Sequence, residues 1–227
     1  MSIQRILTSD GSHTLWNETL NVYYHSVNGA LQESQLIYID LGLKEAIERY
    51  RSVAQSKAPA SISVFEMGFG TGLNALLTWL EADKARIPVQ YVTVEAYPLG
   101  EEQVAELNYD NLLETSRLSA LHQAAWAIET ELSPYFTIEK YRTTLQNFKT
   151  ELRFDAIYYD AFAPSAQAEL WEQEIFGKLA NLLKPGGNLT TYCSKSYVQR
   201  NLRAAGFTVE KHPGPRGKRE VLRAVLM

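Results

Sequence analysis

The sequence predicts an α/β protein whose core is a mostly parallel sheet that ends in an antiparallel hairpin. From Ser61 onward, short β-rich runs alternate with longer helical patterns, which is typical of a parallel sheet covered by helices. A glycine-rich turn follows the first of these strands. At the end of the chain, two strands are separated only by a Pro- and Gly-rich loop, so they should pair antiparallel. We expect one core domain over 61–227 and an N-terminal extension over 1–60.

The extension differs in texture from the core and is expected to be β-rich and packed on it. The runs Leu20–Tyr24 and Leu36–Ile39 read as strands on either side of the turn signal Asn28-Gly29. A helix is expected over Leu43–Val53, where apolar residues recur at close to a 3.6-residue period. The segment Lys57–Ala60 then breaks this pattern, so the extension should end here.

The alternation after Ser61 gives the order of the core elements. Five strands are expected at Ile62–Glu66, Gln90–Val94, Phe136–Glu139, Ala156–Asp160 and Asn188–Tyr192. Helices are expected at Leu73–Ala85, Gly100–Leu113, Ala168–Leu183 and Tyr197–Ala205. The closing hairpin is expected at Phe207–Glu210 and Val221–Val225, which brings the sheet to seven strands. The segment Leu118–Leu132 has no clear pattern.

Composition and charge are those of an ordinary globular protein. The 227 residues are 45% hydrophobic and 21% charged, which is enough apolar material for a large core. No apolar run approaches the roughly 18 residues needed to cross a bilayer. The N-terminus lacks a signal-peptide pattern and Cys193 is the single cysteine, so a reducing cytoplasm is the expected location. The net charge of −4 means that any contact with nucleic acid must be local.

A glycine loop follows the first core strand, in the run Glu66–Leu73 (EMGFGTGL). Ligands of open parallel sheets bind at the carboxyl ends of strands, and glycines let the backbone approach them closely. Gly68, Gly70 and Gly72 have the spacing G-x-G-x-G, not the dinucleotide spacing G-x-G-x-x-G, and no P-loop Lys-Ser/Thr pair follows. The loop therefore favours a nucleoside cofactor of another kind. With no ligand it would be a tight turn between a strand and a helix.

Two carboxylates accompany this loop. Glu95 ends the second core strand, where it can accept two hydrogen bonds from ribose hydroxyls, although an ordinary solvated acid is the alternative. Glu66 could bind an amino group of the ligand directly or through water. The expected cofactor-binding residues are Glu66, Gly68, Phe69, Gly70, Thr71, Gly72, Asn74 and Glu95.

A second candidate site follows the fourth core strand, in the run Tyr159–Pro164 (YDAFAP). Asp160 lies at the carboxyl end of this strand, where a carboxylate can orient an amine and accept its proton. Phe162 and Pro164 would form a wall that stacks a base or excludes water. The alternative is that Asp160 only caps the following turn. We expect an acceptor substrate to dock here, with Asp160 as the catalytic residue.

Polar residues nearer the C-terminus are candidates for further substrate contacts. Ser194 and Lys195 follow the fifth strand, and their alternative role is helix capping. The segment Lys211–Arg223 has five cations and one acid, and within it Lys218 and Arg219 are candidates for phosphate contacts. A solvated loop is the alternative for this segment. The four histidines show no metal-ligand spacing, so no metal is expected.

In combination, these motifs resemble the MnmD methyltransferase family, which corresponds to the methyltransferase half of the bifunctional MnmC enzyme. The motifs are Glu66–Asn74, Glu95–Leu99, Tyr159–Pro164, Leu170-Trp171 and Gly214–Glu220, and Asn28–Ser34 is similar to the N-terminal segment of that family. The resemblance therefore covers nearly the whole chain. Its Phe-Ala-Pro and Gly-Lys-Arg-Glu elements are not general methyltransferase features.

The resemblance implies a class I methyltransferase fold, Rossmann-like, and S-adenosylmethionine as the cofactor. It implies methylation of 5-aminomethyl-2-thiouridine at the tRNA wobble position to 5-methylaminomethyl-2-thiouridine, with the anticodon stem-loop of tRNA as the partner. The flavin-dependent oxidase half of MnmC would be absent from 227 residues. One departure is that Lys140-Tyr141 stand where the family usually has Gly-Asp. Another residue must then contact adenine, and Trp126 is a candidate.

Three alternatives remain open at this point. A small-molecule amine N-methyltransferase or an aminopropyltransferase would share the glycine loop and Glu95 but would not need the basic C-terminal loop. A catalytically silent protein that binds the cofactor or tRNA is kept open by the departure at Lys140-Tyr141.

Overall fold

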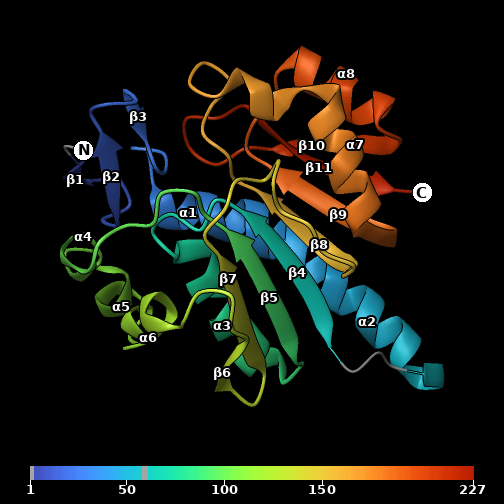
Figure 1. Cartoon of the computed structure of the whole chain (residues 1–227), viewed down its shortest axis with the longest axis horizontal. Coiled ribbons are helices and arrows are strands. Elements are labelled where there is room, and N and C mark those ends of the chain that lie inside the picture. Colours follow the sequence, from blue (N-terminus) through green and yellow to red (C-terminus); the bar gives the residue numbers. More distant parts are fainter. Residues whose placement is uncertain (1–2, 58–60) are drawn as a thin grey trace.

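The computed structural model describes residues 3–57 and 61–227, and its centre is one large twisted sheet (Figure 1). Within these residues the sheet has eight strands in the order β10-β11-β9-β8-β4-β5-β7-β6. Their bounds are β4 Ile62–Met67, β5 Val89–Val94, β6 Thr130–Ser133, β7 Phe136–Tyr141, β8 Phe154–Tyr159, β9 Leu183–Thr191, β10 Phe207–Pro213 and β11 Glu220–Leu226. The expected α/β fold is confirmed.

Parallel pairing holds the middle of the sheet, and antiparallel pairing closes both edges. Strands β7, β5, β4, β8 and β9 are parallel, and the expected C-terminal hairpin β10–β11 pairs antiparallel with β9. At the other edge, β6 pairs antiparallel with β7, so the sheet has one strand more than the seven expected. Most of this short strand lies in the segment that has no clear sequence pattern. Its residues are half-buried or exposed at the edge of the sheet, so they show no alternation of apolar and polar side chains.

The order of strands places a binding crevice next to β4. The chain moves from β4 to β5 in one direction and later returns to place β8 on the other side of β4. Ligands of such sheets bind outside the carboxyl ends of the strands at this reversal. The glycine loop after β4 lies at that point.

Both faces of the sheet are buried. Val64 belongs to the apolar cluster under one face, and its neighbour Phe65 belongs to the cluster under the other, as the alternation of side chains along a strand requires. Helix α3 (Leu73–Ala85) packs in the first cluster, while α7 (Gln173–Leu182) and α8 (Ser196–Ala204) pack in the second. The sheet is therefore the middle layer of three.

Two of the expected helices are divided in the structure. The helix expected over Gly100–Leu113 is two short helices, α4 (Glu101–Ala105) and α5 (Tyr109–Leu112). The helix expected over Ala168–Leu183 is a 3-10 turn (Ala168–Trp171) followed by α7. A further short helix, α6 (Leu118–Gln123), lies in the segment without a clear pattern.

The N-terminal extension differs most from expectation. It begins with a three-stranded antiparallel sheet, β1 (Ile3–Leu7), β2 (His13–Asn17) and β3 (Val22–Tyr23), which lies beside α4 and α5 in Figure 1. The chain then runs through α1 (Ala30–Ser34), a π-helical segment η1 (Gln35–Leu43) and α2 (Lys44–Lys57) without a break. The expected boundary at Ala60 lies outside the described residues.

The predicted strand at Leu36–Ile39 is therefore wrong, because these residues belong to η1. Ile37, Tyr38 and Ile39 are all buried, so the run has no polar side from which a helical period could be recognised. Gly42 brings η1 close to the sheet, since a Cβ there would lie 3.1 Å from the Tyr158 ring. This contact carries Tyr38 toward the carboxyl ends of the strands. No helix in 3–57 or 61–227 is long and apolar enough to cross a membrane.

Candidate active site

The glycine loop makes the sharp turn from β4 into α3. Gly68, Gly70 and Gly72 have φ values of 93°, 49° and 76°, a region that favours glycine. A Cβ at Gly68 would lie 3.1 Å from the Asp160 carbonyl oxygen, and one at Gly72 would lie 2.9 Å from His122 Nε2. The glycines are therefore needed both for conformation and for close approach to neighbouring elements.

Glu95 is fixed at the end of β5 by the backbone around it. The Gly70 N–H donates to Glu95 Oε2 at 3.0 Å, and the Tyr97 N–H donates to Oε1 at 2.9 Å. A carboxylate offers about four lone-pair sites, so each oxygen can accept one more hydrogen bond. A diol such as ribose could supply both donors, which fits the role expected from the sequence.

Two histidines hold the glycine loop at Thr71. His25, from the segment after β3, places Nε2 2.7 Å from Thr71 Oγ1. His122, at the end of α6, places Nε2 3.0 Å from the Thr71 carbonyl oxygen. Burial lowers the pKa of His122 to about 4, so its ring is neutral at physiological pH and donates this hydrogen bond. Neither contact could be predicted from a local pattern in the sequence.

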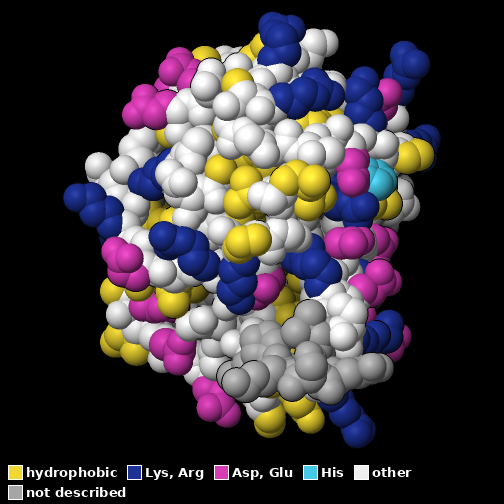
Figure 2. Space-filling model, turned by 90° about the vertical axis from the view of Figure 1, so that its right-hand side faces the viewer, with side chains coloured by type: hydrophobic (Ala, Val, Ile, Leu, Met, Phe, Trp, Pro, Cys, Tyr) yellow, Lys and Arg dark blue, Asp and Glu magenta, His cyan; other side chains and the backbone are white. Residues whose placement is uncertain are grey.

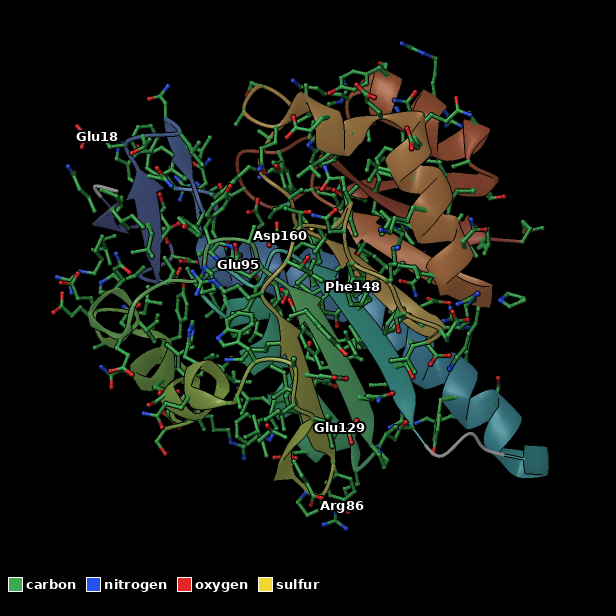
Figure 3. The ribbon with its side chains drawn as sticks, viewed as in Figure 1. Glu18, Arg86, Glu95, Glu129, Phe148 and Asp160 are labelled. Carbon is green, nitrogen blue, oxygen red and sulfur yellow. The ribbon has the colours of Figure 1, made fainter. Side chains whose placement is uncertain are left out.

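A cleft with a volume of about 200 Å³ opens at the carboxyl ends of the strands. Its lining residues are Tyr24-His25, Met67–Thr71, Val94–Tyr97, Thr143–Gln146, Asp160–Phe162, Gln167, Glu169 and Leu170. Figure 3 shows Glu95 and Asp160 at the carboxyl ends of the strands, with Arg86 and Glu129 at the opposite end of the sheet. The two acids expected at the site therefore share one cleft.

Asp160 follows the last residue of β8 and is held at both carboxylate oxygens. The Tyr38 hydroxyl donates to Oδ1 at 2.7 Å, and Asn74 Nδ2 donates to Oδ2 at 2.9 Å. Burial raises the pKa of Asp160 above its ordinary value, while these two donors oppose the rise. Burial also raises the pKa of Tyr38 strongly, so its hydroxyl keeps its proton. The result is an oriented carboxylate that is a stronger base than an exposed aspartate.

Glu66 lies beneath the cleft and is not among the residues that line it. It is fully buried, and it accepts hydrogen bonds from Asn74 Nδ2 at 3.1 Å and Thr93 Oγ1 at 3.0 Å. Burial raises the pKa of Glu66 well above its ordinary value, with a further contribution from Asp160. Asn74, also buried, therefore bridges two carboxylates. The structure thus gives Glu66 and Asn74 contacts with the residues behind the cleft, whereas direct binding of a ligand stays a prediction.

An aromatic wall stands on the acceptor side of the cleft. Phe162 meets Tyr24 edge to face at 5.2 Å between ring centroids. The Phe162 carbonyl accepts a hydrogen bond from Trp171 Nε1 at 2.9 Å, which fixes the backbone of this turn. Pro164 is buried and lies outside the lining. Tyr24 was not expected here, since the sequence places it in a segment that resembles a strand.

The four remaining substrate candidates lie outside the cleft lining. Ser194 precedes α8 and accepts a hydrogen bond from Gln199 Nε2 at its carbonyl, and Lys195 is exposed at the N-cap position. Arg219 is exposed on the loop between β10 and β11. Lys218, on the same loop, pairs with the buried carboxylate of Glu33. A phosphate contact by Lys218 would require this ion pair to break, so the structure does not favour that role.

Lys140, at the position of the family departure, is an internal cation. It is 1% exposed, and its ammonium donates to the carbonyls of Leu121 at 2.8 Å and His122 at 2.7 Å. It also lies 5.2 Å from the centre of the Phe69 ring and 4.8 Å from that of Trp126. Burial lowers the pKa of Lys140 to about 8. The lysine therefore supports the glycine loop from below and makes no contact with the cleft.

Trp126 does not reach the cleft either, so the expectation that it contacts adenine is not supported. It lines a separate hollow between α4 and α6. Thr143–Gln146, in the loop after β7, line the cleft close to Glu95 and are the better candidates for adenine contacts. This loop was not predicted from the sequence, because the acid that the family usually has there is absent.

No group of three or more His, Cys, Asp or Glu residues with metal-ligand geometry is found in the described residues. Cys193 is buried, and burial raises the pKa of its thiol. It therefore lacks the accessible setting of a reactive cysteine. The cleft combines a glycine loop, a carboxylate with acceptor sites for a diol and an oriented base. Such a site can hold a nucleoside cofactor and accept a proton from a nucleophile beside it.

Comparisons with known proteins agree with this description. A family model described as S-adenosyl-L-methionine-dependent methyltransferase matches residues 103–227, more than half of the chain. The chain is also 30% identical over 216 residues to the tRNA 5-methylaminomethyl-2-thiouridine biosynthesis bifunctional protein MnmC of Leptospira borgpetersenii. That match covers 89% of the chain and 32% of the relative, so the chain spans about a third of the length of the relative.

Solved structures show the same fold. MNMC2 from Aquifex aeolicus matches with a TM-score of 0.76 and 23% identity, covering 99% of this chain and 70% of that one. Spermidine synthase from Thermotoga maritima matches with a TM-score of 0.52 and 17% identity, covering 98% and 72%. The resemblance to the MnmD family is confirmed. The chain belongs to the family of S-adenosyl-L-methionine-dependent methyltransferases that this model describes.

Proposed function

We propose that this methyltransferase acts on the primary amine of 5-aminomethyl-2-thiouridine at the wobble position of tRNA and produces 5-methylaminomethyl-2-thiouridine. S-Adenosylmethionine supplies the methyl group as a sulfonium and leaves as S-adenosylhomocysteine. The amine nitrogen forms a bond to the methyl carbon as the carbon–sulfur bond breaks, and the amine releases one proton. This in-line reaction depends on alignment and on a neutral amine.

The substrate assignment is supported by the relative that shares 30% identity with the chain, because its name places it in tRNA 5-methylaminomethyl-2-thiouridine biosynthesis. The match covers 89% of the chain, so it must include the glycine loop and Asp160, which lie in the middle of the chain. It covers only a third of the relative, so the other activities of that protein are not assigned to this chain.

The setting of Asp160 carries the proposal. Its carboxylate lines the cleft and is held by Tyr38 and Asn74. Because burial raises its pKa, it is a better proton acceptor than an exposed aspartate. An acid in this position suits an amine, which must be oriented and must lose a proton. Phe162 and Tyr24 form the adjacent wall against which a uridine base could stack.

The cofactor fits the opposite side of the cleft. Glu95 has free acceptor sites for the ribose hydroxyls, and Thr143–Gln146 line the space beyond it where adenine would lie. Gly68 and Gly70 allow the backbone to approach the methionine portion. In this arrangement the residues would orient the cofactor, and Asp160 would accept the proton of the amine on the side where the methyl group is transferred.

Contacts with tRNA would come from a small set of cations near the cleft. Arg216, Arg219 and Lys195 are exposed. Figure 2 shows the face that lies on the right in Figure 1, away from the N-terminal sheet, and there positive and negative side chains are interspersed. Such a face produces no strong field of one sign. We therefore expect a small footprint on the cleft side and weak, salt-sensitive binding of tRNA.

The test is to incubate the protein with labelled S-adenosylmethionine and tRNA from cells that lack the final methylation, and then to analyse the nucleosides. Label in 5-methylaminomethyl-2-thiouridine is expected with the wild-type protein and not with Asp160→Ala. Fully modified tRNA is the matched control and should accept no label.

Absence of label in the wobble uridine would overturn the proposal. Label in free amines would instead indicate a small-molecule N-methyltransferase. Transfer of an aminopropyl group from decarboxylated S-adenosylmethionine would indicate an aminopropyltransferase. Binding of the cofactor or tRNA with no transfer to any acceptor would indicate a silent binding protein.

A further inference from the structure

A buried ion pair joins the loop between β10 and β11 to helix α1. The ammonium of Lys218 contacts Glu33 Oε2, and the two side chains are 25% and 6% exposed. The other carboxylate oxygen of Glu33 accepts a hydrogen bond from the Ser26 N–H at 3.1 Å. Removing one partner of such a pair leaves the charge of the other buried and uncompensated. The contact therefore matters more than an exposed salt bridge would.

The backbone of the loop is shaped for this contact. Gly217 has φ 88°, and a Cβ there would lie 2.1 Å from Asn28 Nδ2. The loop therefore rests directly on the segment before α1. Lys218 also lies 5.0 Å from the centre of the Tyr192 ring, which favours a cation. The contacts with Glu33 and with the Tyr192 ring fix the direction of the Lys218 side chain.

Two residues near this pair form hydrogen bonds with Asp160 or with the residue after it. Tyr38 follows Glu33 by about one helical turn and donates to Asp160 Oδ1 at 2.7 Å. Tyr192, under the ammonium of Lys218, donates to the Ala161 carbonyl at 2.8 Å. The ion pair is thus connected on both sides to Asp160 and the residue after it.

The charge of Glu33 also acts on Asp160. The groups that bear on the Asp160 carboxylate are His25, Tyr38, Asn74 and Glu33, and Asp160 in turn raises the pKa of both Glu66 and Tyr192. Among them, Glu33 raises the pKa of Asp160 because the two carboxylates repel each other. Lys218 is the cation that pairs with Glu33, so it limits this repulsion.

We propose that Lys218 is a positioning residue for methyl transfer, which neutralises Glu33 and fastens the C-terminal loop to the helix that presents Tyr38 to Asp160. Lys218 then acts within the protein and makes no contact with tRNA phosphate. The inference rests on the proposed function only for the role of Asp160 as proton acceptor. The ion pair itself does not depend on the substrate.

The experiment compares Lys218→Met, Lys218→Arg and the double variant Glu33→Gln/Lys218→Met with wild type. Lys211→Met is the matched control, because Lys211 pairs with Glu220 on the same hairpin at 3.0 Å, with side chains 48% and 31% exposed. The readouts are the single-turnover rate of tRNA methylation against pH, the Kd for S-adenosylmethionine and the salt dependence of tRNA binding.

For Lys218→Met, we expect a rate about tenfold lower at neutral pH, which corresponds to about 1.4 kcal/mol. The acidic limb of its pH profile should shift to higher pH, because unpaired Glu33 makes Asp160 harder to ionise. Lys218→Arg and the double variant should restore the rate and the profile, and Lys211→Met should match wild type. The salt dependence of tRNA binding should not change in any of them.

An unchanged pH profile together with a reduced salt dependence in Lys218→Met would overturn the proposal and make Lys218 a phosphate ligand. If the wild-type protein methylates no tRNA, the proposed function fails, but the inference is still tested. The titration of the Asp160 carboxyl is then followed by NMR in protein without substrate. It should move to higher pH in Lys218→Met and to lower pH in Glu33→Gln, and no movement in either would overturn the inference. Glu33→Gln keeps this test usable if Lys218→Met does not fold.

Discussion

On the cofactor side of the cleft, the glycine loop and Glu95 lie within residues 66–97, with Thr143–Gln146 beside them, whereas the acceptor side draws on residues from more distant parts of the chain. The glycine loop and Glu95 follow adjacent strands, β4 and β5, and contact each other through backbone N–H groups. Asp160 is held by Tyr38, 122 residues away, and by Asn74, 86 residues away. The Lys218–Glu33 contact spans 185 residues.

This difference affects how each side responds to change. Backbone geometry within one β-α-β unit joins the glycine loop to Glu95, so a substitution of the Glu95 side chain should alter one contact at a time. The acceptor side depends on side chains from the extension, α3 and the C-terminal loop, so a substitution in any of these can disturb Asp160. Four predictions test the contrast, beginning with the largest expected effect.

Replacing Asp160 with alanine should separate the two sides most clearly. Turnover should fall by about 10²–10⁴-fold, the usual contribution of a positioned acid or base. The Kd for S-adenosylmethionine, measured by calorimetry, should remain close to that of wild type, because Glu95 and the glycine loop are unchanged. Turnover near the wild-type value would remove Asp160 from the mechanism, and a large loss of cofactor affinity would mean that the two sides are not separable.

Lys140 tests whether the cofactor side is as self-contained as its contacts suggest. Burial lowers the pKa of Lys140 to about 8 from an ordinary value of 10.5. Between these pH values the unfolded chain binds more protons than the folded one, so the free energy of unfolding should rise with pH. Relative to Lys140→Met, the gain for wild type from pH 8 to 10.5 should be on the order of 3 kcal/mol.

The measurement for Lys140 is urea denaturation of both proteins across this pH range. Subtracting the two curves cancels the titration of the tyrosines, which the two proteins share. A flat difference would show that Lys140 has an ordinary pKa and is not held as an internal cation. A raised Kd for S-adenosylmethionine in Lys140→Met would show that the glycine loop needs support from outside 66–97.

Glu95→Gln should affect the cofactor side alone. Loss of the charged acceptor should raise the Kd for S-adenosylmethionine by about tenfold to hundredfold, the range for one hydrogen bond to a charged group. Turnover at saturating cofactor should be retained, since Asp160 and its partners are untouched. Glu102→Gln is the control, because Glu102 is exposed on the following helix. Reduced turnover at saturation would show that Glu95 also aligns the methyl group.

Arg219→Ala should have the smallest effect. Loss of one phosphate contact should weaken tRNA binding across sequences and lower the salt slope by about 1, with cofactor affinity unchanged. Lys211→Ala, on the same hairpin, is the control. The measurement is the Kd for tRNA at several salt concentrations. An unchanged slope would place the tRNA contacts on another part of the surface.

The contrast between the two sides also explains what could be predicted from the sequence. The strands of the core and the glycine loop were predicted because they follow from local patterns: β-rich runs, a helical period and φ values that glycine allows. The strand predicted at Leu36–Ile39 was wrong because a fully buried run looks the same in a helix and in a strand. Lys140 was read as the loss of an acid, and its internal role depends on Leu121 and His122, which lie at the end of another element.

The sequence by itself determined the α/β fold and the family, and it predicted a nucleoside cofactor at the end of β4. It also singled out Asp160 and Glu95, because each directly follows a run of residues that is recognisable as a parallel strand. Only the tertiary structure decided what holds these residues. Tyr38 reaches Asp160 because helix η1 packs on the sheet, and His25 reaches Thr71 from the segment after β3. Lys218 turns inward because the loop that carries it rests on Asn28. Such contacts join residues far apart in the chain, and no local pattern encodes them.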